Sequence, residues 1–429
     1  MSKLENYIFF SNGKTSPTKN SNGKYPIFGS NGIIGYSDKY NTDSAIIIGR
    51  VGAYCGSLYY SEKPCWVTDN AIIAKVKNKD ESLFWFYYLK TKKLNNMQVG
   101  TGQPLLNQSI LKSIQVLLPK NIDKIHIGNQ LNDLDKKIDL NTQINQTLEQ
   151  IAQAIFKSWF IDFDPVRAKA DAIAQGLNLE QTNLSAMEII SGKNQSELAL
   201  MKTKQADKFQ SLYDLANAFP CEFEVIDDVE VPKGWSVKRI CDIAEIIKGK
   251  SYKSSELQPS KTALVTLKSF NRGGGYRLDG LKEFIGKYKP EQEVFPGDLI
   301  VAYTDVTQNA DIIGKPAMVM EDSDYEHLVI SLDVGVVRPN NQNLKYFLYC
   351  LTREIDFQNH TKSFTTGTTV LHLGKDAIPS YQFVHPDNVI LDNFSNIAES
   401  IFEKTNINIV ENKNLSKTRD SLLPKLLKG

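Results

Sequence analysis

Apolar side chains are spaced in two different ways along the chain, and the change between them divides it. Up to about residue 120, short apolar runs at 45–48 and 71–74 are separated by segments rich in Gly, Asn, Ser and Tyr. This pattern is typical of strands joined by loops. One helix is expected there, over 82–94, followed by a Gly-rich turn at 100–104 and a β-like run at 114–119.

Beyond residue 126 the spacing becomes helical. Apolar and amide side chains recur at alternating intervals of four and three residues, which is the pattern of a coiled-coil seam. The seam consists of Ile127, Leu131, Leu134, Ile138, Asn141, Asn145, Leu148, Ala152, Ile155 and Trp159. At 1.5 Å per residue such a helix would span ~50 Å. Because that is too long to cap one small domain, we expect it to pack on another long helix.

The second half of the chain repeats the order of features in the first. The run 346–351 corresponds to 84–89 at an offset of 262, and 366–371 corresponds to 101–106 at an offset of 265. A second seam follows at an offset of 263 and contains Ile390, Phe394, Ile397, Ile401, Lys404, Asn408, Glu411 and Leu415. Several features that agree in order and offset predict an internal duplication.

Asn145 and Asn408 occupy matching positions in the two seams. Two buried amides that hydrogen-bond to each other would lower stability but specify the register of the helices. Alternatively, both amides lie at a wet edge of the seam. The sequence leaves both interpretations open.

These patterns predict an α/β (α+β) fold in which two globular domains are separated by two long antiparallel coiled-coil helices, as a pseudo-two-fold internal repeat. The expected boundaries are a first domain at 1–122, a central helix at 123–164, a connector at 165–230, a second domain at 231–387 and a C-terminal helix at 388–429. The connector should contain helices near 166–175 and 196–218, and a proline-started turn at 231–235 should open the second domain.

Composition narrows the class of protein. Hydrophobic residues make up 41% and charged residues 23% of 429 residues, as in globular proteins. Neither a signal peptide nor an apolar stretch long enough for a membrane span is evident, so we expect a cytoplasmic protein with no membrane contact. The five cysteines show no C-x-x-C spacing, which indicates neither a disulfide framework nor a zinc site.

The net charge of +1 conceals a segregation of charge. Residues 1–120 carry 15 basic and 7 acidic side chains, whereas 121–230 carry 10 and 18. Within the second domain, 246–290 carry 10 basic and 3 acidic residues, and 291–333 carry 1 and 10. A basic surface attracts polyanions such as phosphate backbones, although it can also be only a solvated face.

Motifs that would indicate catalysis are missing. No G-x-x-x-x-G-K-[ST] loop occurs, and the Gly-rich segments 49–52 and 273–275 do not form G-x-G-x-x-G. The segment 163–166 is similar to the [DN]-P-P-[YF] loop of adenine methyltransferases but lacks its second proline and its aromatic residue. The five histidines show no metal-ligand spacing. We therefore expect no catalytic residue and no metal site in this chain.

Polar and aromatic side chains suited to DNA gather in the two globular halves, since Lys contacts phosphates and Arg, Asn and Gln read base edges. In the first half the candidates are Lys24, Tyr25, Asn31, Tyr36, Arg50, Tyr54, Trp66 and Gln103. In the second half they are Lys250, Tyr252, Lys253, Lys268, Arg272, Tyr276, Arg277 and Thr368. For any single residue, a solvated charge or an aromatic at the edge of the core is the alternative.

Five segments together resemble the specificity (S) subunit of Type I restriction-modification systems, over nearly the whole chain. They are the runs 23–36 and 48–52, WFIDFDPV at 159–166, PKGW at 232–235 and TGTT at 366–369. One departure is that the first copy begins at Lys3-Leu4-Glu5 without the P-x-G-W segment, so its first strand should be short.

The resemblance implies two target-recognition domains, each reading one half of a bipartite DNA site, and two conserved helices that hold the halves about one helical turn apart, roughly 34 Å. It further implies double-stranded DNA, two methyltransferase subunits and a restriction subunit as partners. S-adenosylmethionine, ATP and Mg are then expected on those partner subunits, and none of them on this chain.

Three alternatives differ from this interpretation. The chain could serve a fused restriction-methylation enzyme, which only the partner would distinguish. It could be a duplicated interaction scaffold that binds RNA or acidic proteins, in which case the correct DNA site would compete only a few-fold better than random duplex, whereas specific readers gain ~10³ or more. A hidden nuclease or methyltransferase would require activity of the purified chain alone, and we predict none.

Overall fold

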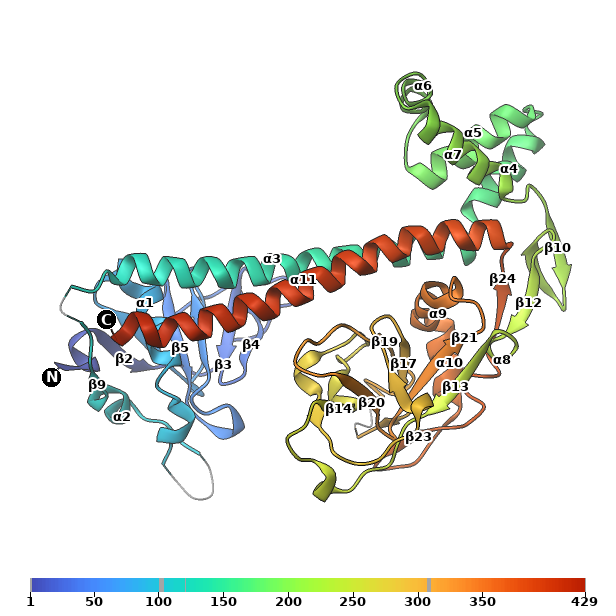
Figure 1. Cartoon of the computed structure of the whole chain (residues 1–429). Helices are drawn as coiled ribbons and strands as arrows, with labels where there is room; N and C mark the ends of the chain where they lie inside the picture. Colours follow the sequence, from blue (N-terminus) through green and yellow to red (C-terminus); the bar gives the residue numbers. More distant parts are fainter. Residues whose placement is uncertain (1, 100–103, 120, 307–309, 429) are drawn as a thin grey trace. The chain divides into compact units, whose positions relative to one another are not determined.

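The computed structural model describes residues 2–99, 104–119, 121–306 and 310–428 (Figure 1). Two compact units are distinguished, one comprising 1–141 and 411–429 and the other comprising 142–410. Each unit contains one globular domain together with a stretch of each long helix. These helices are α3 (Lys124–Phe160, 37 residues) and α11 (Asn388–Lys428, 41 residues).

The main sheet of the first domain has the strand order β2-β8-β5-β6, with antiparallel neighbours. The strands are β2 (Ile8–Asn12), β5 (Ala45–Gly49), β6 (Leu58–Ser61) and β8 (Ala71–Val76). The apolar runs at 45–48 and 71–74 thus lie in the two central strands. All of β5 and the first four residues of β8 are buried, which explains why these runs are continuous rather than alternating.

The remaining elements of the first domain surround this sheet. A second sheet has the order β4-β3-β7, with β3 (Tyr25–Gly29), β4 (Gly32–Ser37) and β7 (Trp66–Val67), and β1 (Ser2–Lys3) pairs with β9 (Gln115–Val116). The helices are α1 (Ser82–Lys90), α2 (Gln108–Ser113) and the 3-10 turns η1 (Leu4–Asn6), η2 (Gly52–Tyr54), η3 (Lys79–Glu81) and η4 (Leu94–Met97). The helix expected over 82–94 ends at Lys90, because Lys93 adopts a left-handed conformation (φ 45°) that no helix continues through.

The main sheet of the second domain has the order β13-β21-β17-β19. Its strands are β13 (Ala244–Lys248), β17 (Leu299–Ala302), β19 (Pro316–Met318) and β21 (Val334–Pro339). A second sheet, β15-β14-β20-β16, consists of β14 (Thr262–Val265), β15 (Lys282–Glu283), β16 (Glu293–Val294) and β20 (His327–Ile330). The strands β12 (Ser236–Arg239) and β24 (Gln382–His385) pair, as do β18 (Thr304–Asp305), β23 (Leu371–Leu373) and β22 (Thr365–Thr366).

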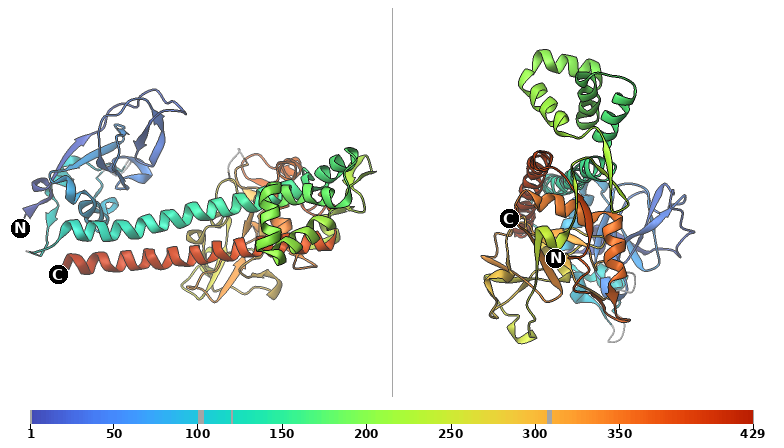
Figure 2. Two further views of the ribbon diagram at one scale, coloured as in Figure 1. Left: turned by 90° about the horizontal axis from the view of Figure 1, so that it is seen from above. Right: turned by 90° about the vertical axis from the view of Figure 1, so that its right-hand side faces the viewer.

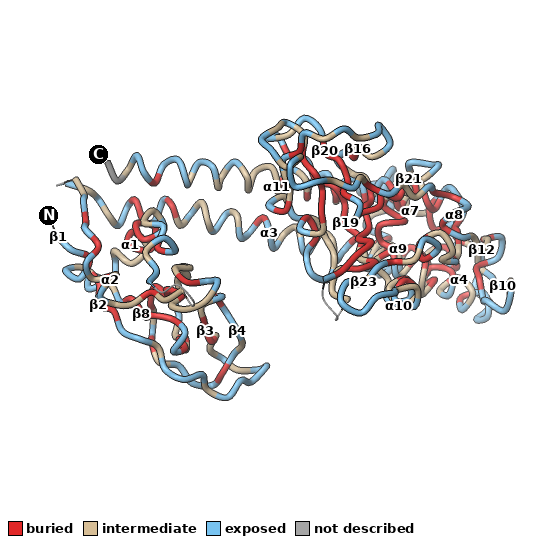
Figure 3. Tube along the Cα trace, turned by 90° about the horizontal axis from the view of Figure 1, so that it is seen from below, coloured by how far each residue is buried: buried red, intermediate tan, exposed pale blue. Residues whose placement is uncertain are grey.

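The helices of the second domain are α8 (Ile240–Ile243), α9 (Leu344–Arg353) and α10 (Ile355–Ser363), with the 3-10 turns η5 (Ser254–Glu256), η6 (Leu267–Ser269), η7 (Leu278–Gly280) and η8 (Pro290–Gln292). The buried residues of this domain follow its central strands and α9 (Figure 3). Helix α9 is buried over nearly its whole length, as its apolar run at 346–351 requires.

The two domains share one topology. The strand orders β2-β8-β5-β6 and β13-β21-β17-β19 correspond strand by strand, and the registers agree: Ile46 pairs with Ala74 in one, and Leu299 pairs with Val337 in the other. The parallel pair β3–β7 corresponds to β14–β20, and the pair β1–β9 corresponds to β12–β24. Among the described residues, β1 covers Ser2–Lys3, and these two residues correspond to the last two of β12. The predicted α+β fold with an internal repeat is confirmed.

Residues 165–230, which we expected to be a connector, form a packed helical module (Figure 2). Its helices are α4 (Asp164–Ala174), α5 (Leu179–Ser191), α6 (Gln195–Lys204) and α7 (Ala206–Ala218), followed by a hairpin of β10 (Phe223–Ile226) and β11 (Val229–Pro232). The helices enclose a core of Ala186, Met187, Leu198, Phe209 and Ala216. Lys169 is buried within the module and donates to the carbonyls of Ala216 and Phe219, at 3.0 and 2.6 Å.

An aromatic cluster joins this module to the second domain and to the end of α3. Phe160 lies 5.2 Å from Phe394 and 6.1 Å from Trp235, measured between ring centroids. Trp235 is the last residue of the predicted turn, whose backbone closes through a 3.0 Å bond from Trp235 N to Pro232 O. The segments 159–166 and 232–235 therefore meet in one core.

In the second unit the stretches of α3 and α11 contact each other through the two matching asparagines. Asn408 Nδ2 donates to Asn145 Oδ1 at 2.7 Å, and Asn145 Nδ2 donates to the carbonyl of Thr405 at 3.3 Å. Asn408 is 1% exposed. These contacts correspond to the buried-pair alternative rather than to a wet edge. Lys404, by contrast, is exposed, and Thr405 beside it is buried, so the second seam departs from a strict copy of the first.

In the first unit the helix stretches are joined by a polar contact as well. Asn141, 1% exposed, donates to Glu411 at 2.7 Å and to Asn412 at 2.9 Å. Arg419 of α11 pairs with Asp135 of α3. Within this unit the two stretches are antiparallel, since contacts further along α3 are made earlier along α11. Of the seam residues in α3, Leu131 is buried, and Leu134 and Ile138 are half-buried.

The other predicted seam positions are half-buried or buried. Phe394 is buried, and Leu148, Ile397, Ile401 and Leu415 are half-buried. Among the described residues, no helix is apolar over enough of its length to cross a membrane.

Candidate nucleic-acid interface

One edge of the first domain is built around the turn 68–71, which leads from β7 into β8. The amide of Ala71 donates to the carbonyl of Thr68 at 3.0 Å and closes the turn. The carbonyl of Asn70 accepts from the amide of Arg50 at 2.9 Å and from the hydroxyl of Ser30 at 2.5 Å. We call residues 30–31, 50–54 and 68–70 the turn edge of the first domain. It brings together three of the predicted residues, Asn31, Arg50 and Tyr54.

The side chains at this edge are available to a ligand to different degrees. Asn31 is exposed, and Tyr54 is 52% exposed. Arg50 is half-buried: its Nη1 lies 3.5 Å from the carbonyl of Asp69, and its buried Nε has no hydrogen-bond partner among the described residues. A guanidinium carries several donors and is suited to bind two acceptors on one base edge or on a phosphate.

Other predicted residues of the first domain lie elsewhere. Lys24, Tyr25 and Tyr36 occupy the opposite end of the β3–β4 hairpin, where Pro26 pairs with Tyr36. The Tyr25 ring packs against Tyr40 at 4.9 Å, and Lys24 Nζ lies 5.5 Å from the centroid of the Tyr25 ring. Trp66 is half-buried in β7. Gln103, and with it most of the predicted Gly-rich turn, lies outside the described residues.

The second domain has an equivalent turn edge. The turn 331–334 closes through a 2.8 Å bond from Val334 N to Ser331 O, and the carbonyl of Asp333 accepts from the amide of Tyr303 at 2.8 Å. We define this edge as residues 267–268, 303–304 and 331–333. Tyr303 therefore holds the backbone position of Arg50, but its ring is 4% exposed. Burial raises the pKa of its hydroxyl to about 12.

A hairpin over 267–280 carries four predicted residues of the second domain. Lys268 and Arg272 are exposed. Arg277 donates two hydrogen bonds to Asp279, at 2.9 and 2.6 Å, so much of its charge is neutralised locally. Tyr276 differs from the prediction: its ring packs against two apolar clusters and its hydroxyl is buried, which raises the pKa of that hydroxyl. It is an aromatic at the edge of the core.

The remaining predicted residues of the second domain are placed as follows. Tyr252 packs against the buried Phe284, and Lys282 donates to the Tyr252 hydroxyl at 3.2 Å. Lys253 and Thr368 are exposed, and Lys250 is half-buried. Thr368 lies in the connection between β22 and β23.

Lys14 is a residue that sequence reasoning missed. It is exposed and lies beside the first turn edge, where its carbonyl accepts from Trp66 Nε1 at 3.4 Å. The sequence contains several Gly-Lys pairs, and two of them, Gly13-Lys14 and Gly249-Lys250, stand at the equivalent place in the two copies, each followed by a hydroxyl residue, Thr15 or Ser251. The pairs are 236 residues apart, whereas the helices repeat at 263, so a search at one offset does not find them.

Each domain is anchored to α3 by a tyrosine and a carboxylate. In the first unit, Tyr87 of α1 donates to Asp135 at 2.7 Å. In the second unit, Tyr349 of α9 donates to Glu149, which also pairs with Arg353. Tyr87 and Tyr349 are 262 residues apart. Buried hydrogen bonds to a charged acceptor hold the helix of each domain in one orientation.

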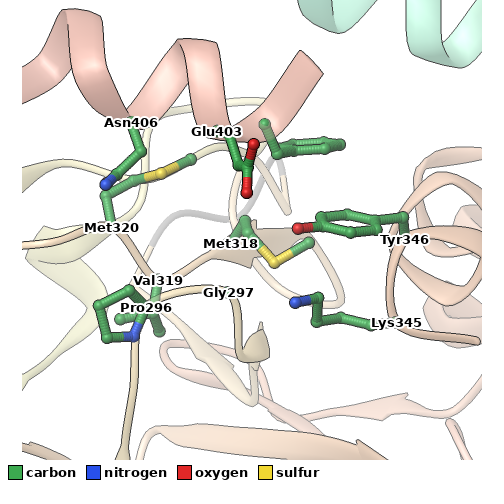
Figure 4. Close-up of a pocket in the computed structure, with 10 residues that line it drawn as sticks. Pro296, Gly297, Met318, Val319, Met320, Lys345, Tyr346, Glu403 and Asn406 are labelled. Atoms are coloured by element: carbon green, nitrogen blue, oxygen red, sulfur yellow. The ribbon is translucent and has the colours of Figure 1, made fainter. Parts of the chain in front are cut away.

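Each unit also contains a crevice between an edge strand and a long helix. In the second unit, a crevice of about 130 Å³ lies between β19 and α11; Met318, Met320 and Tyr346 line it together with Glu403 of α11 (Figure 4). In the first unit, a crevice of about 520 Å³ is lined by Tyr60 at β6 and by Lys136 of α3. β6 and β19 hold equivalent places in their sheets.

No group of three His, Cys, Asp or Glu side chains among the described residues is placed to hold a metal ion. The cysteines are free thiols.

The fold and the two turn edges define a duplicated recognition protein with two similar frames and different side chains on each. The chain belongs to the family described as Type I restriction modification DNA specificity domain, whose model matches residues 4–150 and 232–412. The match leaves out residues 151–231, which include the whole helical module.

Known proteins agree with this assignment. The chain is 35% identical over 350 residues to the Type I restriction enzyme HindI specificity subunit of Haemophilus influenzae, covering 76% of this chain and 71% of that protein. It is 25% identical over 378 residues to the MjaIX specificity subunit of Methanocaldococcus jannaschii, covering 83% and 70%. In fold it is similar to the crystal structure of a Type I S subunit from M. genitalium, with a TM-score of 0.54, 14% identity and coverage of 99% and 95%.

Proposed function

We propose that this specificity subunit recognises a bipartite DNA sequence, with each domain reading one half. The observation that carries the proposal is the pair of turn edges, which share the four-residue turn and the backbone hydrogen bond to it but present different side chains. Arg50 in one corresponds to Tyr303 in the other, and Asn31 to Lys268. Because base readout depends on side chains while the frame fixes only their position, two unlike edges suit two unlike half-sites.

Mapping methylated adenines across the genome, with and without this gene, tests the proposal directly. The expected result is one asymmetric motif, made of two short defined parts with an undefined gap, that loses its methylation when the gene is removed. A single continuous motif, or a motif unaffected by the gene, would contradict it.

We further propose that α3 and α11 set the length of the gap. The 37 residues of α3 extend over about 55 Å at 1.5 Å per residue, and one turn of DNA is about 34 Å. The Asn145–Asn408 hydrogen bond supports a fixed register. Removing a matched block of seven residues from both helices shortens each by about 10 Å. The recognised gap should then shorten by about 3 base pairs, at about 3.4 Å each; a gap of unchanged length would contradict this role.

Finally, we propose that the chain is not catalytic and that two methyltransferase subunits and a restriction subunit supply the chemistry, with S-adenosylmethionine, ATP and Mg bound on them. A crevice beside α11 in the second unit and a crevice beside α3 in the first unit support a docking position in each unit. Residues 121–230 carry 18 acidic and 10 basic side chains, which favours a protein-facing role there. The purified chain alone should show neither methylation nor cleavage of DNA, and light scattering should give two methyltransferase subunits per chain. Activity of the chain alone would contradict the assignment.

A further inference from the structure

In the first domain, the pair Gly13-Lys14 directly follows strand β2, and its backbone is hydrogen-bonded to the turn edge. The amide of Gly13 donates to the carbonyl of Ala71 at 3.0 Å, and the amide of Lys14 donates to the carbonyl of Val67 at 3.0 Å. A parallel bridge links Lys14 to Thr68. The lysine is thus held at the start of the turn that positions Arg50.

The Gly-Lys pair of the second domain is bound in the same way. The amide of Gly249 donates to the carbonyl of Val334 at 3.0 Å, and the amide of Lys250 donates to the carbonyl of Ile330 at 2.8 Å. A parallel bridge links Lys250 to Ser331. The acceptors and the bridged residue all lie 263 positions after their counterparts in the first domain, so the two lysines occupy one and the same backbone position in the repeat.

The glycine before each lysine has a steric reason. A Cβ atom on Gly13 would lie 2.1 Å from the carbonyl oxygen of Thr68, and one on Gly249 would lie 2.1 Å from that of Ser331. Both distances are far shorter than a carbon and an oxygen can approach without the backbone moving. The close approach of β2 and β13 to their turns therefore requires glycine in both copies, and it fixes where the next residue leaves the sheet.

Within the described part of the chain, neither the Lys14 nor the Lys250 ammonium forms an ion pair with a carboxylate, in contrast to Arg277, which pairs with Asp279. Side chains at the turn edges differ between the domains, as Arg50 and Tyr303 show, yet at this position both copies have lysine. A lysine is a compact cation that binds a phosphate oxygen without reading a base.

We propose that Lys14 and Lys250 are equivalent phosphate anchors, each of which binds the DNA backbone at the same place relative to its own recognition domain. This inference rests on the proposed function and adds to it a division of labour: the unlike residues of the turn edges select bases, and the like lysines set the position of the backbone. A common anchor explains why the backbone around Gly13-Lys14 and Gly249-Lys250 is duplicated so closely while turn-edge side chains, such as Arg50 and Tyr303, differ.

The salt dependence of binding tests the proposal. Full-length chain with Lys14→Gln, Lys250→Gln or both is titrated against duplex DNA selected by the wild-type chain from a random pool, and against random duplex, over a range of NaCl concentrations. Each phosphate contact contributes about one to the slope of log K against log [salt]. Each single variant should therefore lower the slope by about one and the double variant by about two, with the same preference for selected over random DNA.

Matched variants keep the result interpretable. Lys204→Gln removes an exposed lysine of the helical module, and its slope should equal that of the wild type. Lys14→Arg and Lys250→Arg should restore the slope. Thermal unfolding of each variant shows whether it folds.

Several results would overturn the anchors. They are a slope that stays unchanged in both single variants, a slope that changes in one domain only, and a change in the selected base sequence, which would make the lysines base readers. If the wild-type chain binds duplex DNA without sequence preference, the proposed function is wrong. The salt dependence of the Lys14 and Lys250 variants would still show whether these lysines contact phosphates.

Discussion

The turn edges of the two domains share one backbone turn but carry different side chains. In both, a turn of four residues accepts the amide that follows the central strand, at 2.9 Å in the first domain and 2.8 Å in the second. The residue that supplies this amide is Arg50 in one and the buried Tyr303 in the other. The comparison shows that the two copies keep the backbone hydrogen bonds that position this residue, whereas the residue itself differs. Side chains can therefore change at this position without a change of fold.

Exchange of a whole domain is the strongest way to break this comparison. Residues 1–122 are replaced by those of a relative with a different motif. If each domain reads its own half-site, only one half of the methylated motif should change, and binding to the original site should fall by roughly 10³-fold or more, the usual margin of specific over random DNA. Sequencing of methylated adenines measures the outcome. A change in both halves would mean that the domains do not act separately.

Substitutions of Arg50 and Tyr303 separate recognition from stability at one backbone position. Tyr303→Ala removes a buried ring and should lower the free energy of unfolding by about 3 to 5 kcal/mol. Arg50→Ala should lower it by less than about 1 kcal/mol, but should relax base discrimination in one half-site by about 1 to 3 kcal/mol. Urea unfolding and binding to single-base variants of the site measure the two effects.

The control for this pair is Tyr303→Phe. The Tyr303 hydroxyl is buried without a hydrogen-bond partner among the described residues, so its loss should leave stability unchanged or slightly higher. A loss above about 1 kcal/mol would show that the hydroxyl has a bound partner, such as an ordered water.

Much of this frame was predictable from the sequence. The apolar runs 45–48 and 71–74 are continuous because β5 and β8 are central strands covered on both faces. Apolar spacing that alternates between three and four residues over ten positions specifically predicts a long packed helix. The repeat was visible because its helices kept one offset. The matching Asn145 and Asn408 were visible for the same reason.

The features that the sequence did not predict depend on tertiary contacts, which the spacing of apolar and polar residues does not reveal. Tyr276 was assigned to a surface because aromatic residues suit both a DNA interface and the edge of a core, and only packing distinguishes them. Lys404 was placed in the seam by copying the first helix, but α11 turns Thr405 inward instead. The helices at 165–230 close on a core of their own, which a polar and acidic composition did not indicate. The loops between strands differ in length, so the Gly-Lys pair fell outside the helix offset.

Substitutions of Gly13 and Gly249 test whether the backbone at the two turn edges tolerates an added Cβ atom equally poorly. Gly13→Ala and Gly249→Ala should each lower the free energy of unfolding by about 1 to 3 kcal/mol, the range for forcing an added methyl into a packed site. The losses should be similar because both Cβ atoms would meet a backbone oxygen at 2.1 Å. Gly29→Ala is the matched control, since its Cβ would meet only side-chain atoms at ordinary contact distances, Ile34 at 3.4 Å and the Thr68 hydroxyl at 3.7 Å. Unequal losses in urea unfolding would show that one frame can relax and the other cannot.

The asparagine pair offers the finest test, because there the two copies contact each other with the same residue. A double-mutant cycle of Asn145→Ala and Asn408→Ala should give a coupling energy of about 1 kcal/mol, the net value of one hydrogen bond. Coupling indistinguishable from zero would place both amides in water. Replacing both by Leu should keep or raise stability, since a polar pair in a seam is less stabilising than an apolar one. If the pair fixes the register, that stable variant should methylate sites with more than one gap length; a single unchanged gap would assign the register to the rest of the seam.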